Sequence, residues 1–214
     1  MHKLDRNAVP APPCLADYRH GLHSWEKDLT REHRAQIHAH LEQLQGHWCA
    51  YCEGDMNSLG RHVDHLERRT KHPELTFAWS NLYWSCYQDD SCGRYKDHRG
   101  RAHDPKELVD PAVHDPDHFF RFRSDGFIEV RSGLSQADKL RAENTLKAFN
   151  LQNARLQFER RRALEMYQAQ EPDILEFLET LSPAERGNVI ADELKHTTEG
   201  PFSTVIRHFL ERAL

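Results

Sequence analysis

The stretch HWCAYCEGDMNSLGRHVDHLERR, residues 47–69, decides what kind of protein this sequence encodes. It opens with two cysteines three positions apart, Cys49 and Cys52, and a second pair, Cys86 and Cys92, follows farther along the chain. Zinc in structural sites prefers a closed tetrahedron of soft ligands, which two such pairs can supply from the two ends of a loop. The sequence therefore predicts a structural zinc site with no open position for catalysis; coincidental thiols or a redox pair are the alternatives.

Composition limits the classes of function. The chain has 214 residues, a formal net charge of −5 and five cysteines. It contains no run of eighteen apolar residues and starts without a signal-peptide pattern, so we expect a cytoplasmic protein without a membrane segment. In a reducing compartment, paired cysteines are more often metal ligands than disulfides. Cys14 lies apart from the pairs and is expected to be a small buried apolar residue.

The charge balance bears on nucleic-acid binding. A negative chain does not coat nucleic acid by bulk electrostatics, so any contact must be local. The basic stretch RHVDHLERRTKH, residues 61–72, is the obvious place for it.

The patterns along the chain predict an α+β fold that is mostly helical. Residues 1–46 read as an arm followed by a helix over 26–46, which Gly46 ends. Residues 47–104 form the metal module, and 105–214 a hairpin and helices. Asp125-Gly126 between alternating apolar and polar residues predicts the hairpin.

The last part of the chain predicts helices that pack as a bundle against the metal module. Ser135 caps the first of these, and a second spans 153–170 before a break at Pro172. Ser182 begins a third with Glu185 at the capping-box position, and a short helix ends the chain. The basic cluster at 159–162 is expected to be a solvated face.

Between the cysteine pairs lie residue types suited to a second, catalytic metal. Hydrolysis of a phosphodiester needs a hard cation to stabilise charge and a neutral imidazole to take a proton from water. Asp64 offers the oxygen ligand that magnesium or manganese prefers, and His65 offers the base. Asn81 could orient the imidazole through a hydrogen bond. The basic side chains expected to hold phosphates are Arg61, Arg68, Arg69 and Lys96.

Residue types alone leave a plain solvated loop as the alternative, but the ordered motifs resemble a known family. CAYCE, HVDHLERR, FAWSNLYWSC and SCGRYKDH, with MHKLDR at the start, are similar to the zinc-containing HNH endonucleases. They most resemble the PtuB-like HNH nucleases of Septu and retron anti-phage systems. This resemblance implies a zinc-stapled ββα-metal module with the catalytic histidine at the end of its first strand.

The resemblance also implies residue roles. His65 would be the general base, Asp64 a divalent-metal ligand and Asn81 the middle residue of the HNH triad, with the four cysteines on zinc. Two departures are visible. Members of this branch often carry glutamate where Asp64 stands, and many HNH proteins carry asparagine or histidine, as the last metal ligand, where this chain has Gly93. The missing ligand would then come from one of three residues: Asp97, His98 or His62.

The resemblance thus implies a metal-dependent endonuclease, with magnesium or manganese as catalytic ion and zinc as structural ion. Its implied partners are a PtuA-like ATPase, and a retron reverse transcriptase with its RNA–DNA hybrid. Two rival functions stay open: an adaptor that has lost the second metal, and a purely structural zinc protein. The sequence does not distinguish a DNA from an RNA substrate such as tRNA, and gives neither cleavage sequence, trigger nor stoichiometry.

Overall fold

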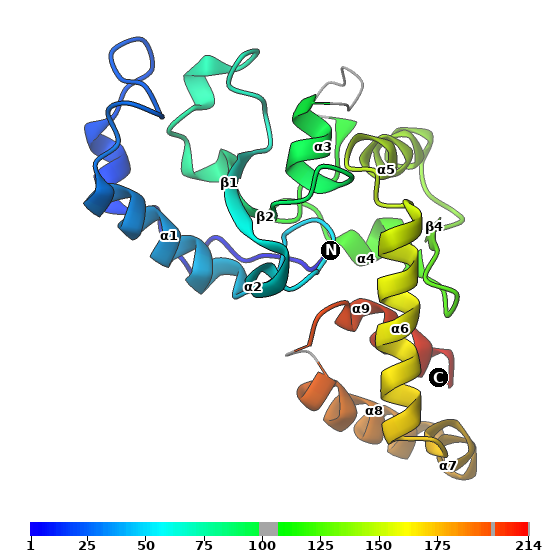
Figure 1. The fold of residues 1–214 in the computed structure, drawn as a ribbon. Coiled ribbons are helices and arrows are strands. Elements are labelled where there is room, and N and C mark those ends of the chain that lie inside the picture. The colour runs from blue at the N-terminus through cyan, green and yellow to red at the C-terminus, as the bar shows by residue number, and fades with distance from the viewer. Residues whose placement is uncertain (99–106, 198–199, 214) are drawn as a thin grey trace.

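A computed structural model describes residues 1–98, 107–197 and 200–213 (Figure 1). About half of the chain is helical, and two small antiparallel sheets complete an α+β fold, which confirms the predicted class. Within the described ranges, every helix is too short or too polar to cross a membrane.

The first sheet lies at the centre of the molecule. Its strands, β1 (Arg61–His65) and β2 (Leu82–Cys86), run antiparallel and are followed by helix α3 (Cys92–His98), which packs against both. All of β2 is buried, whereas β1 becomes buried only towards its end. This order of strand, strand and helix is the one that the resemblance implies, and it makes His65 the last residue of β1.

Helix α1 (Arg31–Gln45) packs on β2 with its apolar stripe of Ile37, Leu41 and Leu44. The Thr30 hydroxyl accepts a hydrogen bond from the His33 amide and begins the helix, and Gly46 ends it with φ of 62°. The predicted start at residue 26 was therefore wrong, because a threonine cap satisfies the free amides of the first turn and residues 25–28 form a turn before it.

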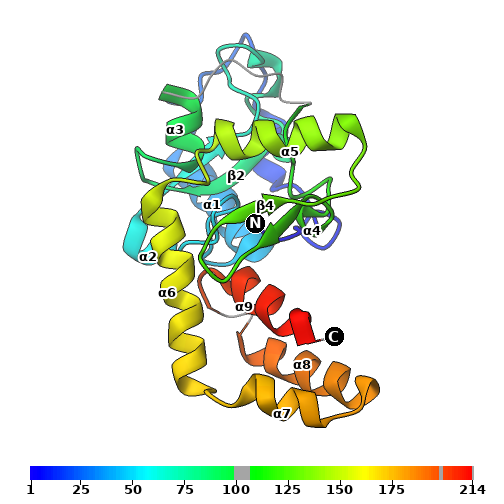
Figure 2. The same ribbon diagram turned by 90° about the vertical axis from the view of Figure 1, so that its right-hand side faces the viewer.

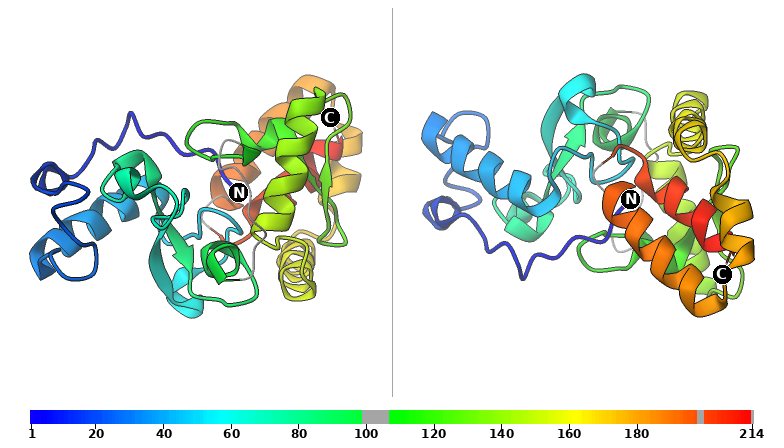
Figure 3. Two further views of the ribbon diagram at one scale, coloured as in Figure 1. Left: turned by 90° about the horizontal axis from the view of Figure 1, so that it is seen from above. Right: turned by 90° about the horizontal axis from the view of Figure 1, so that it is seen from below.

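The N-terminal arm runs from the middle of the molecule to the outer end of α1 (Figure 3). It contains the short 3₁₀ helix η1 (Pro13–Asp17), in which Cys14 is buried as predicted. Three more short helices lie between the arm and α3: α2 (Met56–Leu59), η2 (Pro73–Leu75) and η3 (Trp79–Asn81).

The predicted hairpin is present. Helix α4 (Pro116–Phe119) leads into strands β3 (Phe120–Phe122) and β4 (Ile128–Val130), which pair antiparallel on either side of the turn at Gly126. Gly126 has φ of 81°, and a Cβ at this position would lie 2.0 Å from the carbonyl oxygen of Gln157. Only glycine satisfies both conditions.

Of the remaining helices, α5 lies in the upper part of the molecule in Figure 2, and the others extend into its lower part. Helix α6 descends from the central region, and α9 lies between α8 and strand β3. The predicted caps at Ser135, at Ser182 and at Glu185 are present, whereas α7 was not predicted. The bounds are α5 (Gln136–Ala148), α6 (Ala154–Gln170), α7 (Ile174–Thr180), α8 (Pro183–Thr197), α9 (Ser203–Leu210) and η5 (Glu211–Ala213).

One side chain of the basic cluster at 159–162 is buried, contrary to the prediction of a solvated face. The Arg160 guanidinium donates to the carbonyl oxygens of Gly126 and Leu151, at 3.2 and 2.8 Å, and lies over the ring of Phe122. Burial lowers the pKa of Arg160 to about 10. The guanidinium therefore joins α6 to the turn of the hairpin and to the segment that precedes α6.

Helix α9 joins the C-terminal helices to the cysteine module. Its Thr204 amide and hydroxyl donate to the buried Glu53 carboxylate at 3.1 and 2.7 Å, and the Phe202 amide donates to the Glu53 carbonyl at 3.2 Å. Glu53 follows Cys52 directly. The two parts of the chain are therefore in contact beside the cysteine cluster.

Candidate functional site

The four paired cysteines converge. Cys49 and Cys52 lie on the turn before α2, Cys86 ends β2 and Cys92 begins α3, and all four are buried. Their sulfur atoms lie within 4.8 Å of one another, and those of Cys52 and Cys86 are 3.9 Å apart. Zinc–sulfur bonds of about 2.3 Å in a tetrahedron place sulfurs about 3.8 Å apart. The cluster therefore fits a zinc ion.

Backbone amides donate hydrogen bonds to two of these sulfur atoms, which favours thiolates that can bind a cation. The Gly54 amide donates to the Cys52 sulfur at 3.4 Å, and the Cys86 amide donates to the Cys49 sulfur at 3.3 Å. Burial raises the pKa of the Cys92 thiol, and the neighbouring cysteines raise it further. Four thiolates would therefore coexist here only around a metal ion, as a structural zinc site requires.

Asp64 lies on β1 and is buried with both carboxylate oxygens engaged by the protein. The Tyr51 hydroxyl donates to Oδ2 at 2.6 Å, and Lys96 Nζ lies 3.3 Å from Oδ1. Burial raises the pKa of Tyr51 well above its usual value, and the charge of Asp64 raises it further, so Tyr51 stays protonated. This donor, between the first two cysteines, was missed at the sequence level, although its place beside zinc ligands was a usable signal.

His65 projects from the opposite face of β1, where it is only 5% exposed. Its Nε2 lies 2.9 Å from the carbonyl oxygen of Thr76. Because a carbonyl only accepts, Nε2 carries the proton and Nδ1 holds the free lone pair. The Trp25 ring lies edge-on against the imidazole at 4.6 Å between centroids. Neither Thr76 nor Trp25 gives a signal in the sequence, because one acts through its backbone and the other lies far along the chain.

The protonation state of His65 follows from its burial, which lowers its pKa to about 4. At neutral pH the imidazole is therefore neutral. A neutral imidazole with a defined free nitrogen is the form that takes a proton from water.

Asn81 fixes a loop rather than the imidazole. Its side-chain oxygen accepts from the Glu67 amide at 2.7 Å, and its amide nitrogen donates to the carbonyls of Glu67 and Leu75 at 3.0 and 3.2 Å. The expected hydrogen bond to His65 is replaced by this arrangement. Because Leu75 precedes Thr76, Asn81 holds the loop whose carbonyl orients His65.

The donors expected for a catalytic divalent cation do not leave a position for it, because Asp64 and Asp97 both contact the Lys96 ammonium. Asp97 and His98 are exposed at the end of α3, and His62 lies on the Asp64 face of β1 with a buried Nδ1 that has no hydrogen-bond partner. Among residues 1–98, 107–197 and 200–213, three or more such donor groups come together only at the cysteines. The described residues therefore do not fit a magnesium or manganese site, and we assign no reaction step to such an ion.

The basic residues expected to hold phosphates are paired with carboxylates. Arg61 contacts Glu42 at 3.4 Å, and Arg69 contacts Glu26 at 2.5 Å. Arg68 lies 3.3 Å from Asp97.

Lys96 departs furthest from its predicted role in phosphate binding, because it is fully buried. Its ammonium contacts Asp64, Asp97 and the backbone of His65, so in this structure it faces the protein and not a ligand. A lysine four positions after Cys92 is expected to be exposed in this polar stretch, and only the close packing of α3 on β1 shows otherwise.

Comparison with known proteins adds to this geometry. No family model matches the chain. The chain is 29% identical over 132 residues to a protein of Vibrio cholerae serotype O1 biovar El Tor described as "Retron Vc95 putative HNH endonuclease". The match covers 58% of this chain and 62% of that protein, less than two thirds of its length. The predicted resemblance is thus confirmed by sequence similarity, over 58% of the chain, to a retron protein described as a putative HNH endonuclease.

Proposed function

We propose that this chain is an endonuclease that hydrolyses phosphodiester bonds of nucleic acid as an effector of a retron or Septu type of anti-phage defence. One observation carries the proposal: His65 ends β1 as a neutral imidazole whose Nδ1 holds the lone pair, on a sheet whose second strand ends at Cys86 of the cysteine cluster that fits zinc. The similarity to a retron protein described as an HNH endonuclease supports the same reading. The residue roles and partners that the resemblance to PtuB-like enzymes implies are part of this proposal.

In the proposed reaction, Nδ1 of His65 takes a proton from the water that attacks phosphorus, the bond from phosphorus to the leaving sugar oxygen breaks, and that oxygen takes a proton from solvent. Asn81 keeps the base in place through the loop that carries Thr76. Arg61 and Arg69 hold the phosphates of the substrate. Both are now in ion pairs near the surface, which are worth about 0–1 kcal/mol, so phosphates can displace the carboxylates.

The burial of His65 supports control by a partner. An imidazole that is 5% exposed and packed against Trp25 cannot reach a phosphodiester until neighbouring residues move. The proposed partners are a PtuA-like ATPase, and a retron reverse transcriptase with its RNA–DNA hybrid. Their binding would expose the base and so activate an enzyme that is dormant alone.

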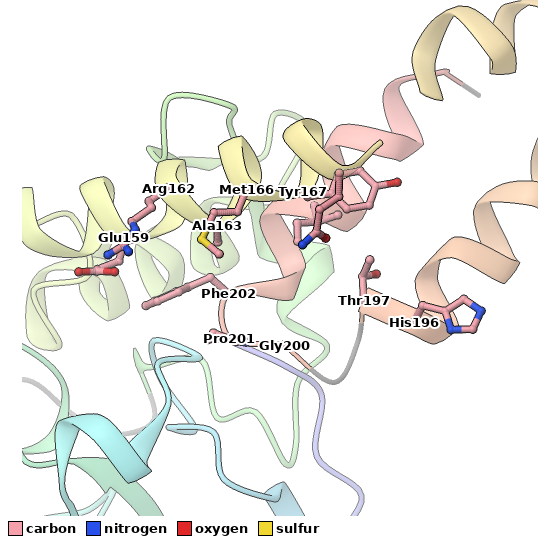
Figure 4. Close-up of a pocket in the computed structure, with 12 residues that line it drawn as sticks. Glu159, Arg162, Ala163, Met166, Tyr167, His196, Thr197, Gly200, Pro201 and Phe202 are labelled. Carbon is pink, nitrogen blue, oxygen red and sulfur yellow. The ribbon is translucent and has the colours of Figure 1, made fainter. Parts of the chain in front are cut away.

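The proposed docking region is residues 105–214. Its helices expose the large apolar side chains Phe158, Met166 and Phe177, each about half accessible. A pocket of about 410 Å³ opens between α6 and the segment that precedes α9 (Figure 4). Tyr167 and Phe202 line it from the two sides, which gives a partner an apolar hollow to fill.

An adaptor without catalytic activity is the second candidate, and the same covered imidazole favours it. If Trp25 stays over His65 in the assembled complex, the module would bind nucleic acid or a partner through its arginines and cut nothing.

A cleavage assay separates the two functions. The full chain, with a PtuA-like ATPase and retron components as proposed partners, is incubated with plasmid, single-stranded DNA and total tRNA, in magnesium, in manganese and without added divalent ions. Wild type and His65→Ala are compared at equal zinc content and equal thermal stability. Cleavage by wild type alone supports the nuclease and identifies its substrate, whereas two equally inert proteins in the activated complex overturn it in favour of the adaptor.

A further inference from the structure

The Lys96 ammonium lies in the position expected for a metal ion at Asp64. Nζ is 3.3 Å from Asp64 Oδ1, 2.7 Å from Asp97 Oδ1 and 2.8 Å from the carbonyl oxygen of His65. The side chains of Lys96 and Asp64 are both fully buried. Three oxygen atoms from the end of β1 and from α3 therefore already surround one positive charge.

The charges of this cluster cancel. Asp64 and Asp97 supply two negative charges, while Lys96 and Arg68 supply two positive ones, since Arg68 Nε lies 3.3 Å from Asp97 Oδ1. A divalent cation binds where carboxylates leave an excess of negative charge. A divalent ion at Asp64 would therefore meet two carboxylates that are already paired and an ammonium 3.3 Å from Asp64.

The surroundings of the Asp64 carboxylate are also closely packed. Its Oδ1 is shielded from solvent and accepts no well-aligned hydrogen bond, so the ion pair with the Lys96 ammonium at 3.3 Å compensates its charge. A Cβ on Gly93 would lie 2.5 Å from the same oxygen. The oxygen therefore lies close to the backbone of α3 at Gly93, a residue that has no side chain to offer as a ligand.

We propose that the Lys96 ammonium is the resident cation of this site, so that Asp64 is a partner of lysine and does not ligate a divalent metal. Lys96 then positions the end of β1, because it binds the backbone of His65 as well as Asp64. The inference concerns the site of the proposed function and deepens it, but metal binding is measured independently of cleavage.

The test is the binding of Mn²⁺ to the zinc-loaded full chain, measured by electron paramagnetic resonance and calorimetry. The proteins compared are wild type, Asp64→Asn, Lys96→Met and the double variant, with zinc content checked in each. We expect Asp64→Asn to leave the Mn²⁺ affinity of wild type unchanged. Lys96→Met, which frees the Asp64 carboxylate, should tighten binding by about tenfold or more, and the double variant should lose this gain.

Two results overturn the proposal. One is an Mn²⁺ site in wild type that Asp64→Asn weakens by about tenfold or more. The other is a folded Lys96→Met protein that gains no Mn²⁺ site, since the ammonium would then not be what excludes the ion. If Lys96→Met does not fold, wild type and Asp64→Asn decide the question alone. An inert protein in the cleavage assay overturns the proposed function and leaves this result unaffected.

Discussion

The two buried clusters on the β1–β2 pair contain residues that commonly ligate metals, yet they are organised in opposite ways. At the cysteine cluster the four sulfurs point at one another, within 4.8 Å. At Asp64 the carboxylates point at an ammonium of the protein itself, 3.3 Å from Asp64 and 2.7 Å from Asp97. Residue type alone is thus a poor guide to a metal site. A better guide is whether the protein already places a cation of its own beside the carboxylates.

The largest effect should follow from breaking the cysteine cluster. Cys52→Ser, or removal of zinc by a chelator, should unfold the region around β1, β2 and α3, because zinc binding in such sites contributes about 10–16 kcal/mol to folding. Hydrogen exchange and zinc analysis measure this. Cys14→Ser is the matched control and should keep its zinc; equal stability of the Cys52 variant and this control would contradict a structural zinc site.

The second effect concerns the ion pair. Lys96→Met leaves the buried Asp64 carboxylate uncompensated and should lower the free energy of unfolding by about 3–5 kcal/mol, whereas removing both charges should cost less than the two single changes together. Denaturant unfolding of the four proteins of the cycle measures the coupling. Asp97→Asn, at a carboxylate that is 40% exposed, should cost no more than about 1 kcal/mol. Additive effects at Lys96 and Asp64 would exclude the pair.

The third effect depends on pH. The pKa of His65 in the fold is about 4, below the value of about 6.5 in an unfolded chain. The unfolded chain therefore binds the proton first, and stability should fall as the pH drops from about 6.5 to 4, by about 3 kcal/mol in total. Unfolding of wild type and His65→Asn across this window isolates the contribution of His65. Identical pH profiles would show that His65 is not buried as described.

The smallest effect compares two helical glycines. Gly93→Ala places a Cβ 2.5 Å from Asp64 Oδ1 and should destabilise the protein by about 1–3 kcal/mol, since overpacking forces this carboxylate to shift. Gly187→Ala on α8 meets nothing within 4 Å and should stabilise it by up to about 1 kcal/mol through helix propensity. Thermal unfolding of both variants measures the difference. A neutral Gly93→Ala would mean that Asp64 does not press on α3.

Features with local signals were predictable from the sequence. The cysteine spacing predicted the cluster, Asp125-Gly126 predicted the hairpin, and Ser135 and Ser182 predicted helix starts, because each depends on a few neighbouring residues. The motif order placed His65 at the end of a strand, and the structure has it there.

Features that depend on long-range packing were not predictable. Lys96 and Arg160 look like surface residues in polar stretches, and each is buried because elements distant in sequence supply oxygen acceptors. The same holds for the carbonyl of Thr76 that orients His65. Every residue has a backbone carbonyl, so the residue type gives no indication of this contact. Asn81 was predicted as a residue of the site, but its hydrogen bonds to the loop could not be read from the chain.

Anomalous diffraction tests the contrast between the two clusters most directly. Crystals of the full chain grown with zinc and soaked in Mn²⁺ would be measured at the absorption edges of both metals. The account predicts a zinc peak among the sulfurs of Cys49, Cys52, Cys86 and Cys92, and Lys96 against Asp64 with no manganese peak there. A manganese peak in bonding contact with Asp64, with Lys96 turned away, would contradict it.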